Sequence, residues 1–283
     1  MGDGSRAVLI TGCSSGIGRE TARHLAGKGW KVYATARRPD SIEDLKGEGC
    51  ETLACDVNDE ASMSACVSAV EEAEGAVGVL VNNAGYSQSG AIETVPMDAV
   101  RRQFDTNVFG LMRMCQLVLP GMRAQRWGRI VNLSSMGGKL VFPGGGAYHA
   151  TKHAVEALSD ALRFEVAGFG IGVVVIEPGL IKTRFAEAAV GAMADALPTD
   201  GPYAEFNAAV GRETAGIYKG PLAILGSGPE AVARKIERAI SSRRPRARYG
   251  VTPSATMALA ARRLLTDRMW DRVMTTQFPR PGR

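Results

Sequence analysis

Short apolar runs alternate along the chain with longer segments of helical periodicity, and this alternation limits the possible folds more than any other feature. Runs rich in β-branched residues, each with the length of a buried strand, occur at residues 7–11, 31–36, 51–54, 77–81, 129–133 and 172–177. Between them, apolar residues recur at three- and four-residue spacing over residues 17–27, 61–73, 100–123 and 148–167. Strict alternation of strand and helix predicts an α/β fold: a Rossmann-like, doubly wound parallel sheet flanked by helices.

The length of 283 residues suits one large α/β domain, and we expect a single domain over residues 1–283. One shift in composition, toward Ala, Gly and Pro, covers residues 186–228. This segment follows the carboxyl end of an expected strand, where ligands of such sheets bind, so we expect a substrate lid there. A helix at residues 229–242 and a last strand near residues 246–251 complete the expected fold.

The C-terminal extension, residues 254–278, has an apolar side and a basic side, which predicts an amphipathic helix or a pair of helices. The apolar side contains Met257, Leu259, Leu264, Leu265, Met269, Trp270, Val273 and Met274, and the basic side contains Arg262, Arg263, Arg268 and Arg272. Two roles are open. The extension packs beside the lid and closes the pocket, which we favour, or it makes peripheral contact with an anionic membrane.

Composition and charge exclude several classes of protein. No apolar run reaches the roughly 18 residues of a membrane-spanning helix, and the N-terminal sequence MGDGSRAVLITG enters the first expected strand without a charged leader. We therefore expect a cytoplasmic protein. The net charge of +5 is mild and much of it lies in the C-terminal part, so it favours an anionic small ligand or a membrane surface over a nucleic-acid partner. The five cysteines form no C-x-x-C pair and have no histidine at metal-ligand spacing, so we expect reduced thiols and no metal.

The turn after the first expected strand reads TGCSSGIG and predicts a dinucleotide site. Its glycines Gly12, Gly16 and Gly18 let a pyrophosphate approach the backbone, while unpaired N–H groups of the following helix attract it. At the end of the second expected strand, NAD enzymes place an acidic residue that binds the ribose hydroxyls, but this chain has Arg37 and Arg38. Because a guanidinium matches a phosphate monoester, the sequence predicts NADP(H) as the cofactor.

Further motifs in the same order make the chain resemble the short-chain dehydrogenase/reductase family. They are CDV at 55–57, NNAG at 82–85, Asn107, SS at 134–135, YHATK at 148–152 and PG at 178–179, and with the glycine turn they span residues 11 to about 183. The segments VYATAR and VVVIEPGLIKT and the basic extension are most similar to the hydroxysteroid and retinol dehydrogenase branch. The cofactor-binding residues that the motifs and the resemblance imply are Gly12, Ser14, Ser15, Gly16, Ile17, Gly18, Arg37, Arg38, Asp56, Val57, Asn83, Ala84, Gly85, Tyr148, Lys152, Pro178, Gly179 and Thr183.

The stretch AYHATKHA places a phenol, Tyr148, one helical turn before a cation, Lys152. A hydride that moves to a ketone leaves an alkoxide that must be protonated, and a free phenol with a pKa near 10 is a poor acid–base group at neutral pH. A permanent ammonium on the same helix face favours the phenolate, so Tyr148 is the expected acid and base.

The resemblance supplies two further catalytic residues. Ser135, rather than Ser134, stands 13 residues before Tyr148, as the family serine does, and would fix the carbonyl oxygen. Asn107 would hold a water that joins Lys152 to solvent. We interpret the histidines His24, His149 and His153 as structural or surface residues.

These features predict an NADP(H)-dependent ketone reductase or alcohol dehydrogenase. Residues 90–95, 137–146 and 186–228 should form a pocket with almost no fixed charge, which favours an uncharged lipophilic substrate such as a steroid, a retinoid or a long-chain carbonyl. Two alternatives stay open: a 3-oxoacyl-carrier-protein reductase, whose acidic partner could meet Arg126 and Arg129, and a non-catalytic NADP-binding regulator. The intact catalytic residues count against the second alternative.

The expected helices at residues 100–123 and 148–167 carry apolar residues on more faces than one sheet can cover. Related enzymes pair through these helices, so the resemblance implies a homodimer or homotetramer.

Overall fold

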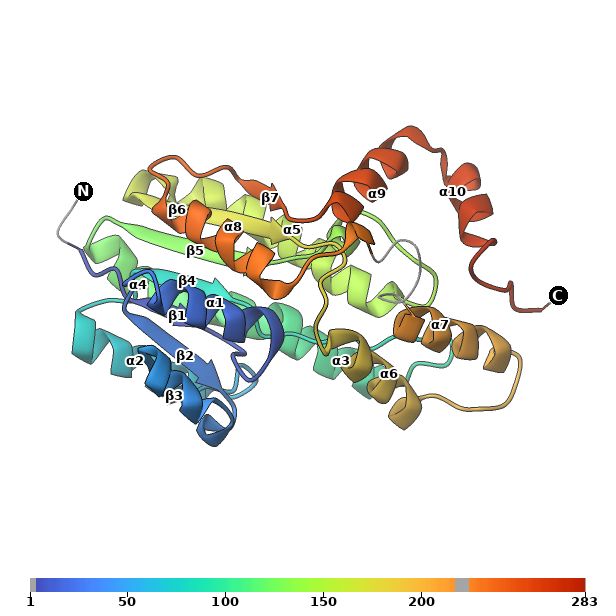
Figure 1. Ribbon diagram of the computed structural model, residues 1–283, viewed down its shortest axis with the longest axis horizontal. Helices are drawn as coiled ribbons and strands as arrows, with labels where there is room; N and C mark the ends of the chain where they lie inside the picture. The colour runs from blue at the N-terminus through green and yellow to red at the C-terminus, as the bar shows by residue number, and fades with distance from the viewer. Residues whose placement is uncertain (1–3, 217–223, 283) are drawn as a thin grey trace.

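The computed structural model describes residues 4–216 and 224–282 and contains one parallel sheet of seven strands (Figure 1). The strand order is β3-β2-β1-β4-β5-β6-β7, so the chain reverses its direction of winding between β1 and β4. Ligands of such sheets bind beyond the carboxyl ends of the strands at this reversal. The strands are β1 (Val8–Ile10), β2 (Val32–Ala36), β3 (Cys50–Ala54), β4 (Val79–Asn82), β5 (Gly128–Leu133), β6 (Ile171–Glu177) and β7 (Arg248–Gly250). The predicted doubly wound sheet is confirmed.

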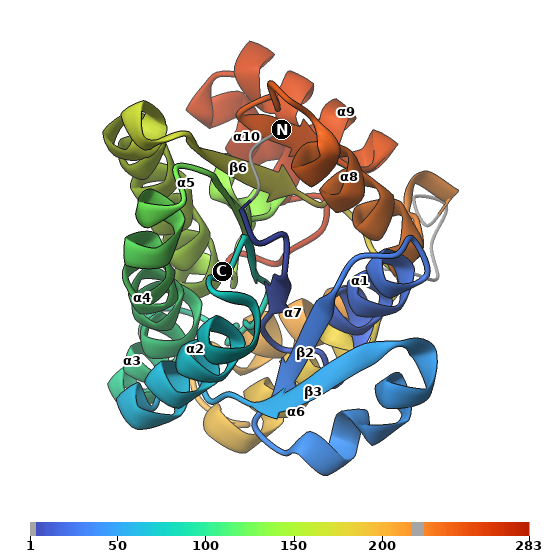
Figure 2. The ribbon, with the colours of Figure 1, turned by 90° about the vertical axis from the view of Figure 1, so that its left-hand side faces the viewer.

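Two layers of helices cover the sheet (Figure 2). Helices α1 (Gly16–Ala26) and α8 (Pro229–Ser241) lie on one face, and α2 (Glu60–Glu74), α4 (Leu111–Ala124) and α5 (Gly146–Val166) lie on the other. Successive side chains of β1 alternate between the layers: Val8 and Ile10 pack with α1 and α8, whereas Leu9 packs with the second layer. Because both faces are buried, the central strands are mainly apolar, whereas the edge strands β3 and β7 contain polar residues that are exposed or half-buried.

The helix predicted at residues 100–123 differs from the structure. Helix α3 (Met97–Phe104) passes into a π-helical turn, η2 (Asp105–Gly110), before α4 begins. Within η2, a Cβ on Gly110 would lie 2.3 Å from the carbonyl oxygen of Val57. The backbone of η2 therefore lies directly against the backbone of the loop after β3. The same turn directs the side chain of Asn107 toward the residues that follow β4. A wider turn of this kind is frequent at functional sites.

Four helices lie beyond the carboxyl ends of the strands: α6 (Phe185–Ala196), α7 (Ala204–Gly216), α9 (Pro253–Leu264) and α10 (Asp267–Met274) (Figure 1). Phe278, after α10, packs against a small apolar cluster that includes Met193 of α6 and Phe206 of α7. The C-terminal extension therefore reaches the lid that the sequence predicted. Residues 217–223 of that predicted lid lie outside the described residues.

Short helical turns complete the described chain: η1 (Pro39–Glu48), η3 (Met136–Gly138) and η4 (Ala167–Phe169). All five cysteines are buried and have free thiols, as the sequence predicted. In residues 4–216 and 224–282, no helix is both long and apolar enough to cross a bilayer. The same part of the chain contains no group of three metal-ligating side chains.

Candidate active site

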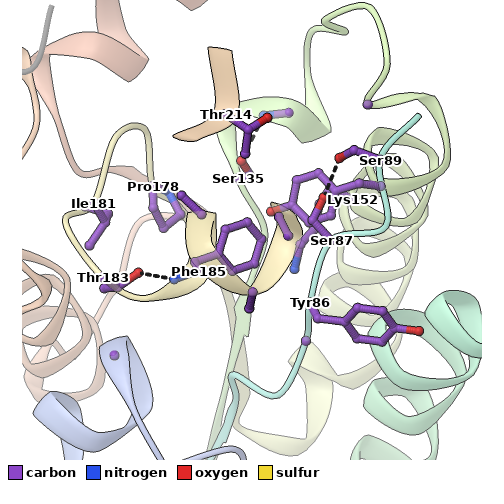
Figure 3. Close-up of a pocket in the computed structure, with 18 of the residues that line it drawn as sticks. Tyr86, Ser87, Ser89, Ser135, Lys152, Pro178, Ile181, Thr183, Phe185 and Thr214 are labelled. Carbon is purple, nitrogen blue, oxygen red and sulfur yellow. Dashed lines mark hydrogen bonds between the residues drawn. The ribbon is translucent and has the colours of Figure 1, made fainter. Parts of the chain in front are cut away.

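A cavity of about 2040 Å³ runs beyond the carboxyl ends of the strands, from the first turn of α1 to the C-terminal helices. Figure 3 shows part of it, with Ser135 and Lys152 among the labelled residues. Every residue that the sequence assigned to cofactor binding or catalysis lines this cavity, except Gly18 and Asn107. The structure thus brings together residues that lie far apart in the sequence.

The turn between β1 and α1 is shaped to bind a phosphate. Gly12 has a φ of 74°, which favours glycine, and a Cβ on Gly18 would lie 2.4 Å from the Asn83 amide nitrogen. Asn83 Nδ2 donates to the carbonyl oxygens of Thr11 (2.8 Å) and Gly12 (3.0 Å) and so fixes the turn from below. At the start of α1, Ser15 makes no side-chain capping bond, and the first turn contains no acidic residue. Its N–H groups are therefore free to bind a pyrophosphate.

The end of β2 offers positive charge where the adenosine of a dinucleotide would lie. Arg37 and Arg38 are exposed and line the cavity, and neither forms an ion pair within the described residues. Opposite them, the loop after β3 is held by the Asp56 carboxylate, which accepts from the Asn58 N–H at 3.0 Å. This arrangement fits a phosphorylated ribose, because a guanidinium without a partner can form a charge-assisted bond to the phosphate.

Lys152 is buried beside Tyr148 on α5. Its Nζ lies 5.8 Å from the centre of the Tyr148 ring and donates to the Leu133 carbonyl oxygen at 2.8 Å. Burial lowers the pKa of Lys152 to about 8, and the nearby Glu156 carboxylate opposes this shift. The sequence predicted a permanent cation at Lys152, and desolvation brings its pKa closer to physiological pH, although the ammonium still predominates at pH 7.

Ser135 and Ser134 occupy different environments just after β5. The Ser135 hydroxyl accepts from the Gly137 N–H at 3.1 Å, which leaves its own proton available to donate to a substrate oxygen. The Ser134 hydroxyl is buried without a hydrogen-bond partner in the described residues. The geometry therefore favours Ser135 over Ser134 as a donor, and its catalytic role stays a prediction.

Asn107 does not line the cavity, but its side chain joins two segments that form the cavity wall. Its Oδ1 accepts from the Tyr86 N–H at 3.1 Å, and its Nδ2 donates to the Tyr86 carbonyl oxygen at 2.9 Å and the Thr151 hydroxyl at 3.1 Å. The amide thus joins the segment after β4 to the middle of α5. Its predicted role in holding a water stays a prediction.

His149 holds the loop of residues 139–146 against Tyr148. Burial lowers its pKa to about 4, so the ring is neutral at physiological pH. Its Nε2 accepts from the Phe142 N–H at 3.3 Å, which leaves Nδ1 to donate to the Gly137 carbonyl oxygen at 3.1 Å. The ring centre lies 5.6 Å from that of Tyr148. His149 is therefore structural, as expected from the sequence, but it also lines the cavity.

A cluster of buried charges lies behind Lys152, and the sequence analysis missed it. The Glu156 carboxylate accepts from Arg248 Nε at 2.9 Å and Lys139 Nζ at 3.0 Å. Burial and the neighbouring Glu156 raise the pKa of Glu177 to about 7. The only signal in the sequence is that Glu156 follows Lys152 by one helical turn, which places both on one face of α5.

The substrate end of the cavity also differs from the prediction. Residues 90–95 do not line it, because Ala91 packs with Met193 and Phe206, and its N–H donates to Asn207 Oδ1 at 2.9 Å. Parts of the other two predicted segments, 137–146 and 186–228, do line the cavity, for example Phe142 and Val210. Further lining residues lie outside all three segments: Ser87, Ser89, Phe185, Met257 and Trp270. For Ser87 and Ser89, the sequence offered one indication of this position, the small polar residues that follow the NNAG motif.

Comparisons with known proteins identify the family of this chain. The family model described as short chain dehydrogenase matches residues 6–193. The chain belongs to the short-chain dehydrogenase/reductase family. It is therefore an oxidoreductase of that family with a nucleotide-binding Rossmann-like fold. The closer assignment to the hydroxysteroid and retinol dehydrogenase branch stays a prediction.

Among family members with curated descriptions, the "Uncharacterized oxidoreductase YbbO" of Escherichia coli is 36% identical over 95% of this chain and 94% of its own. The "NADPH-dependent 3-dehydrocapnine reductase" of Ornithobacterium rhinotracheale is 35% identical over 95% of each chain. The "3-ketodihydrosphingosine reductase" of Bacteroides thetaiotaomicron is 41% identical over 64% of this chain and 65% of its own.

Solved family structures superpose over most of the chain. A short-chain dehydrogenase from Streptomyces avermitilis is 32% identical, with a TM-score of 0.79 over 97% of this chain and 96% of that one. Serine dehydrogenase in complex with NADP⁺ is 26% identical, with a TM-score of 0.75 over 87% and 94%. A Burkholderia phymatum family member in complex with NAD is 24% identical, with a TM-score of 0.78 over 100% and 99%, and supports the fold alone.

The charge cluster behind Lys152 leads to a prediction about pH. If catalysis needs the Lys152 ammonium, kcat/KM should fall as pH rises through its pKa of about 8. Glu156→Gln removes the carboxylate that raises this pKa, so the alkaline limb of the pH profile should move to lower pH. Glu165→Gln, an exposed change on the same helix, should leave the limb in place. An unchanged limb in a folded Glu156→Gln protein would contradict the interpretation.

Proposed function

We propose that this protein is an NADP(H)-dependent reductase of lipophilic ketones or aldehydes that also oxidises the corresponding alcohols. The observation that carries the proposal is the single cavity that joins the phosphate-binding turn and Arg37 to Ser135, Tyr148 and Lys152. The sequence motifs predict one reaction for these residues, and their position around one cavity supports it. We also propose one domain over residues 1–283 and a cytoplasmic location.

The proposed reaction uses three side chains of this chain. Ser135 donates its free hydroxyl proton to the substrate oxygen and so orients the carbonyl. Tyr148 donates a proton to the developing alkoxide in reduction and accepts it in oxidation. Lys152, positioned by the Leu133 carbonyl, adds positive charge beside the phenol, which favours its ionised form. When bound, the nicotinamide of NADP(H) supplies or accepts the hydride.

The wall that faces Tyr148 supports a lipophilic substrate. Phe185 lies with its ring centre 5.7 Å from that of Tyr148, and the C-terminal extension adds an apolar surface. This surface contains Met257, Ala258, Ala261, Trp270, Val273, Met274 and Phe278. Two relatives are named for ketone reduction, of 3-dehydrocapnine and of 3-ketodihydrosphingosine, and the second compound carries a long hydrocarbon chain. We therefore rank a long-chain carbonyl above a steroid or retinoid.

Of the two arginines that could meet an acidic acyl-carrier-protein partner, one is not accessible for that contact. Arg129 is buried over the Trp127 ring, where its guanidinium donates to the carbonyl oxygens of Gly128 (2.8 Å) and Ser242 (3.3 Å). It does not meet a partner protein. Arg126 is exposed. A non-catalytic NADP-binding regulator differs from the proposed enzyme in one measurable property, turnover.

We propose that residues 186–228 and 254–278 act together as the lid, and that the contacts of Trp270 hold this lid against the cavity. The Trp270 indole N–H donates to the Val141 carbonyl oxygen at 3.1 Å, and its ring centre lies 6.0 Å from that of Phe142. The Arg262 guanidinium carbon lies 5.9 Å from the centre of the Trp270 ring. These contacts support pocket closure over the alternative of peripheral membrane contact, because they direct Trp270 toward the cavity.

Exposed apolar side chains on the α4 and α5 layer support a homodimer or homotetramer. Phe109 and Met112 are more than two-fifths exposed, and Phe164 of α5 is 88% exposed. Such side chains are costly in water and are typical of subunit contacts. We propose that this surface pairs with a second copy of the chain.

Turnover tests the proposed activity. We expect the wild type to oxidise NADPH in the presence of long-chain ketones, and Tyr148→Phe to lower kcat by at least about a hundredfold, because the proton donor is lost. Binding of NADPH, measured by its fluorescence, should persist in the variant. A wild-type protein that binds NADPH but reduces no carbonyl in a broad panel would support the regulator instead.

Cofactor preference tests the role of Arg37. A charge-assisted bond to the ribose phosphate contributes ~1.5–3 kcal/mol, so the wild type should bind NADPH roughly ten- to a hundredfold more tightly than NADH. Arg37→Ala should lose most of this ratio and leave the Kd for NADH nearly unchanged. Arg244→Ala, on the loop after α8, is a distant control. Equal affinities of the wild type for the two cofactors would contradict the assignment.

Steady-state kinetics test the lid. Trp270→Ala removes a large apolar contact and the bond to Val141, so KM for long-chain ketones should rise roughly tenfold or more. Short ketones that end before the C-terminal wall should keep their kcat and KM. Arg268→Ala, an exposed change on the same helix, is the matched control. If Trp270→Ala instead abolished binding to anionic liposomes and left the kinetics unchanged, the membrane role would be correct.

A further inference from the structure

The segment after β4 brings two serine side chains close to the proposed reaction centre. A Cβ on Gly85 would lie 3.9 Å from Lys152 Nζ, so the backbone passes directly beside that ammonium. Ser87 is two residues further along the chain, and consecutive Cα atoms are about 3.8 Å apart. Its Cα therefore lies within about 7.6 Å of that of Gly85. Ser87 and Ser89 both line the cavity that contains Tyr148 and Ser135.

The two hydroxyls form a buried pair with unused hydrogen-bonding capacity. Ser87 Oγ and Ser89 Oγ are 3.1 Å apart, and the residues are only 6% and 8% exposed (Figure 3). Each hydroxyl has one proton to donate, but the bond between them uses only one of the two protons. Within the described residues neither hydroxyl forms another hydrogen bond. One donor and several lone pairs therefore remain for a molecule in the cavity.

The backbone that carries the pair is held from three sides. Asn107 binds both the N–H and the carbonyl oxygen of Tyr86. Gln88 Nε2 donates to the Ala192 carbonyl oxygen of α6 at 3.2 Å, and the Gly90 N–H donates to the Gly144 carbonyl oxygen at 2.7 Å. A site fixed in this way loses little conformational entropy when it binds a ligand.

We propose that Ser87 and Ser89 form a hydrogen-bonding subsite for a polar group on the carbon next to the reacting carbonyl. The preferred substrate is then an α-hydroxyketone or a close analogue with an apolar chain. Charge-neutral hydroxyls suit a hydroxyl group, and much of the remaining wall is apolar. A plain ketone would leave the serine donor buried without a partner, which costs binding energy. The inference rests on the proposed function, because it assumes that Tyr148 and Ser135 receive the carbonyl.

The test compares two ketones of equal chain length that differ only in an α-hydroxyl group. For the wild type with NADPH, kcat/KM for the hydroxyketone should exceed that for the plain ketone by about tenfold or more. In Ser87→Ala and Ser89→Ala this ratio should fall toward one, because kcat/KM for the hydroxyketone should fall more than kcat/KM for the plain ketone. Thr214→Val is the control, because its hydroxyl also belongs to the cavity wall but donates to the Val210 carbonyl oxygen at 2.7 Å. It should keep the wild-type ratio.

Binding measurements separate this proposal from the proposed activity. Calorimetry with NADP⁺-loaded protein would compare a vicinal diol with the matched mono-alcohol, which needs no turnover. Tighter binding of the diol by the wild type, lost in both serine variants, would support the subsite even if no ketone were reduced. Equal binding of the two alcohols, or a preference that survives in both folded variants, would overturn it.

Discussion

The side-chain amide of Asn83 joins the two strands between which the cofactor site forms. Its Nδ2 binds the carbonyl oxygens of Thr11 and Gly12, while the Asn83 and Ala84 N–H groups donate to the Thr11 hydroxyl at 3.0 Å. β1 and β4 are paired in the sheet but lead to opposite directions of winding, so the loops that follow them diverge beyond this point. The amide holds the phosphate-binding turn and the segment that carries Ser87 in one rigid unit. The two ends of the cavity are therefore positioned by the same interaction.

The second constraint is a buried ammonium. Removing Lys152 from water is costly, and its depressed pKa measures part of that cost. The structure offsets it locally through the Leu133 carbonyl and, one turn further along α5, through Glu156. Glu156 is itself buried and is compensated by Arg248 and Lys139. A chain of alternating charges thus connects Lys152 with β7, and part of the stability of the domain is used to hold a charge beside Tyr148.

The sequence predicted those parts of the molecule that depend on local patterns. Apolar runs located the strands, and glycine spacing located the phosphate-binding turn, because each is encoded in consecutive residues. The π-helical turn at Asp105–Gly110 was missed, since one wider turn hardly changes the apolar spacing of a long helix. The salt bridges of Glu156 and the contact of Trp270 with Val141 were also missed. They join residues distant in sequence, and only the fold determines which of many charged or aromatic side chains meet.

The loop of residues 139–146 connects the proposed lid with α5, the helix that carries Tyr148. The carbonyl oxygen of Val141 accepts from the indole N–H of Trp270. The N–H of the next residue, Phe142, donates to His149 Nε2, and the His149 ring packs against Tyr148. Under the proposed function, an apolar substrate chain beside Trp270 and Phe142 would lie against the loop that His149 holds in place. The His149 ring is neutral and bonded at both nitrogens, so these contacts fix its position near neutral pH. The proposed substrate wall and the proposed proton donor are therefore joined by three consecutive ring contacts, from Trp270 to Phe142, from Phe142 to His149 and from His149 to Tyr148.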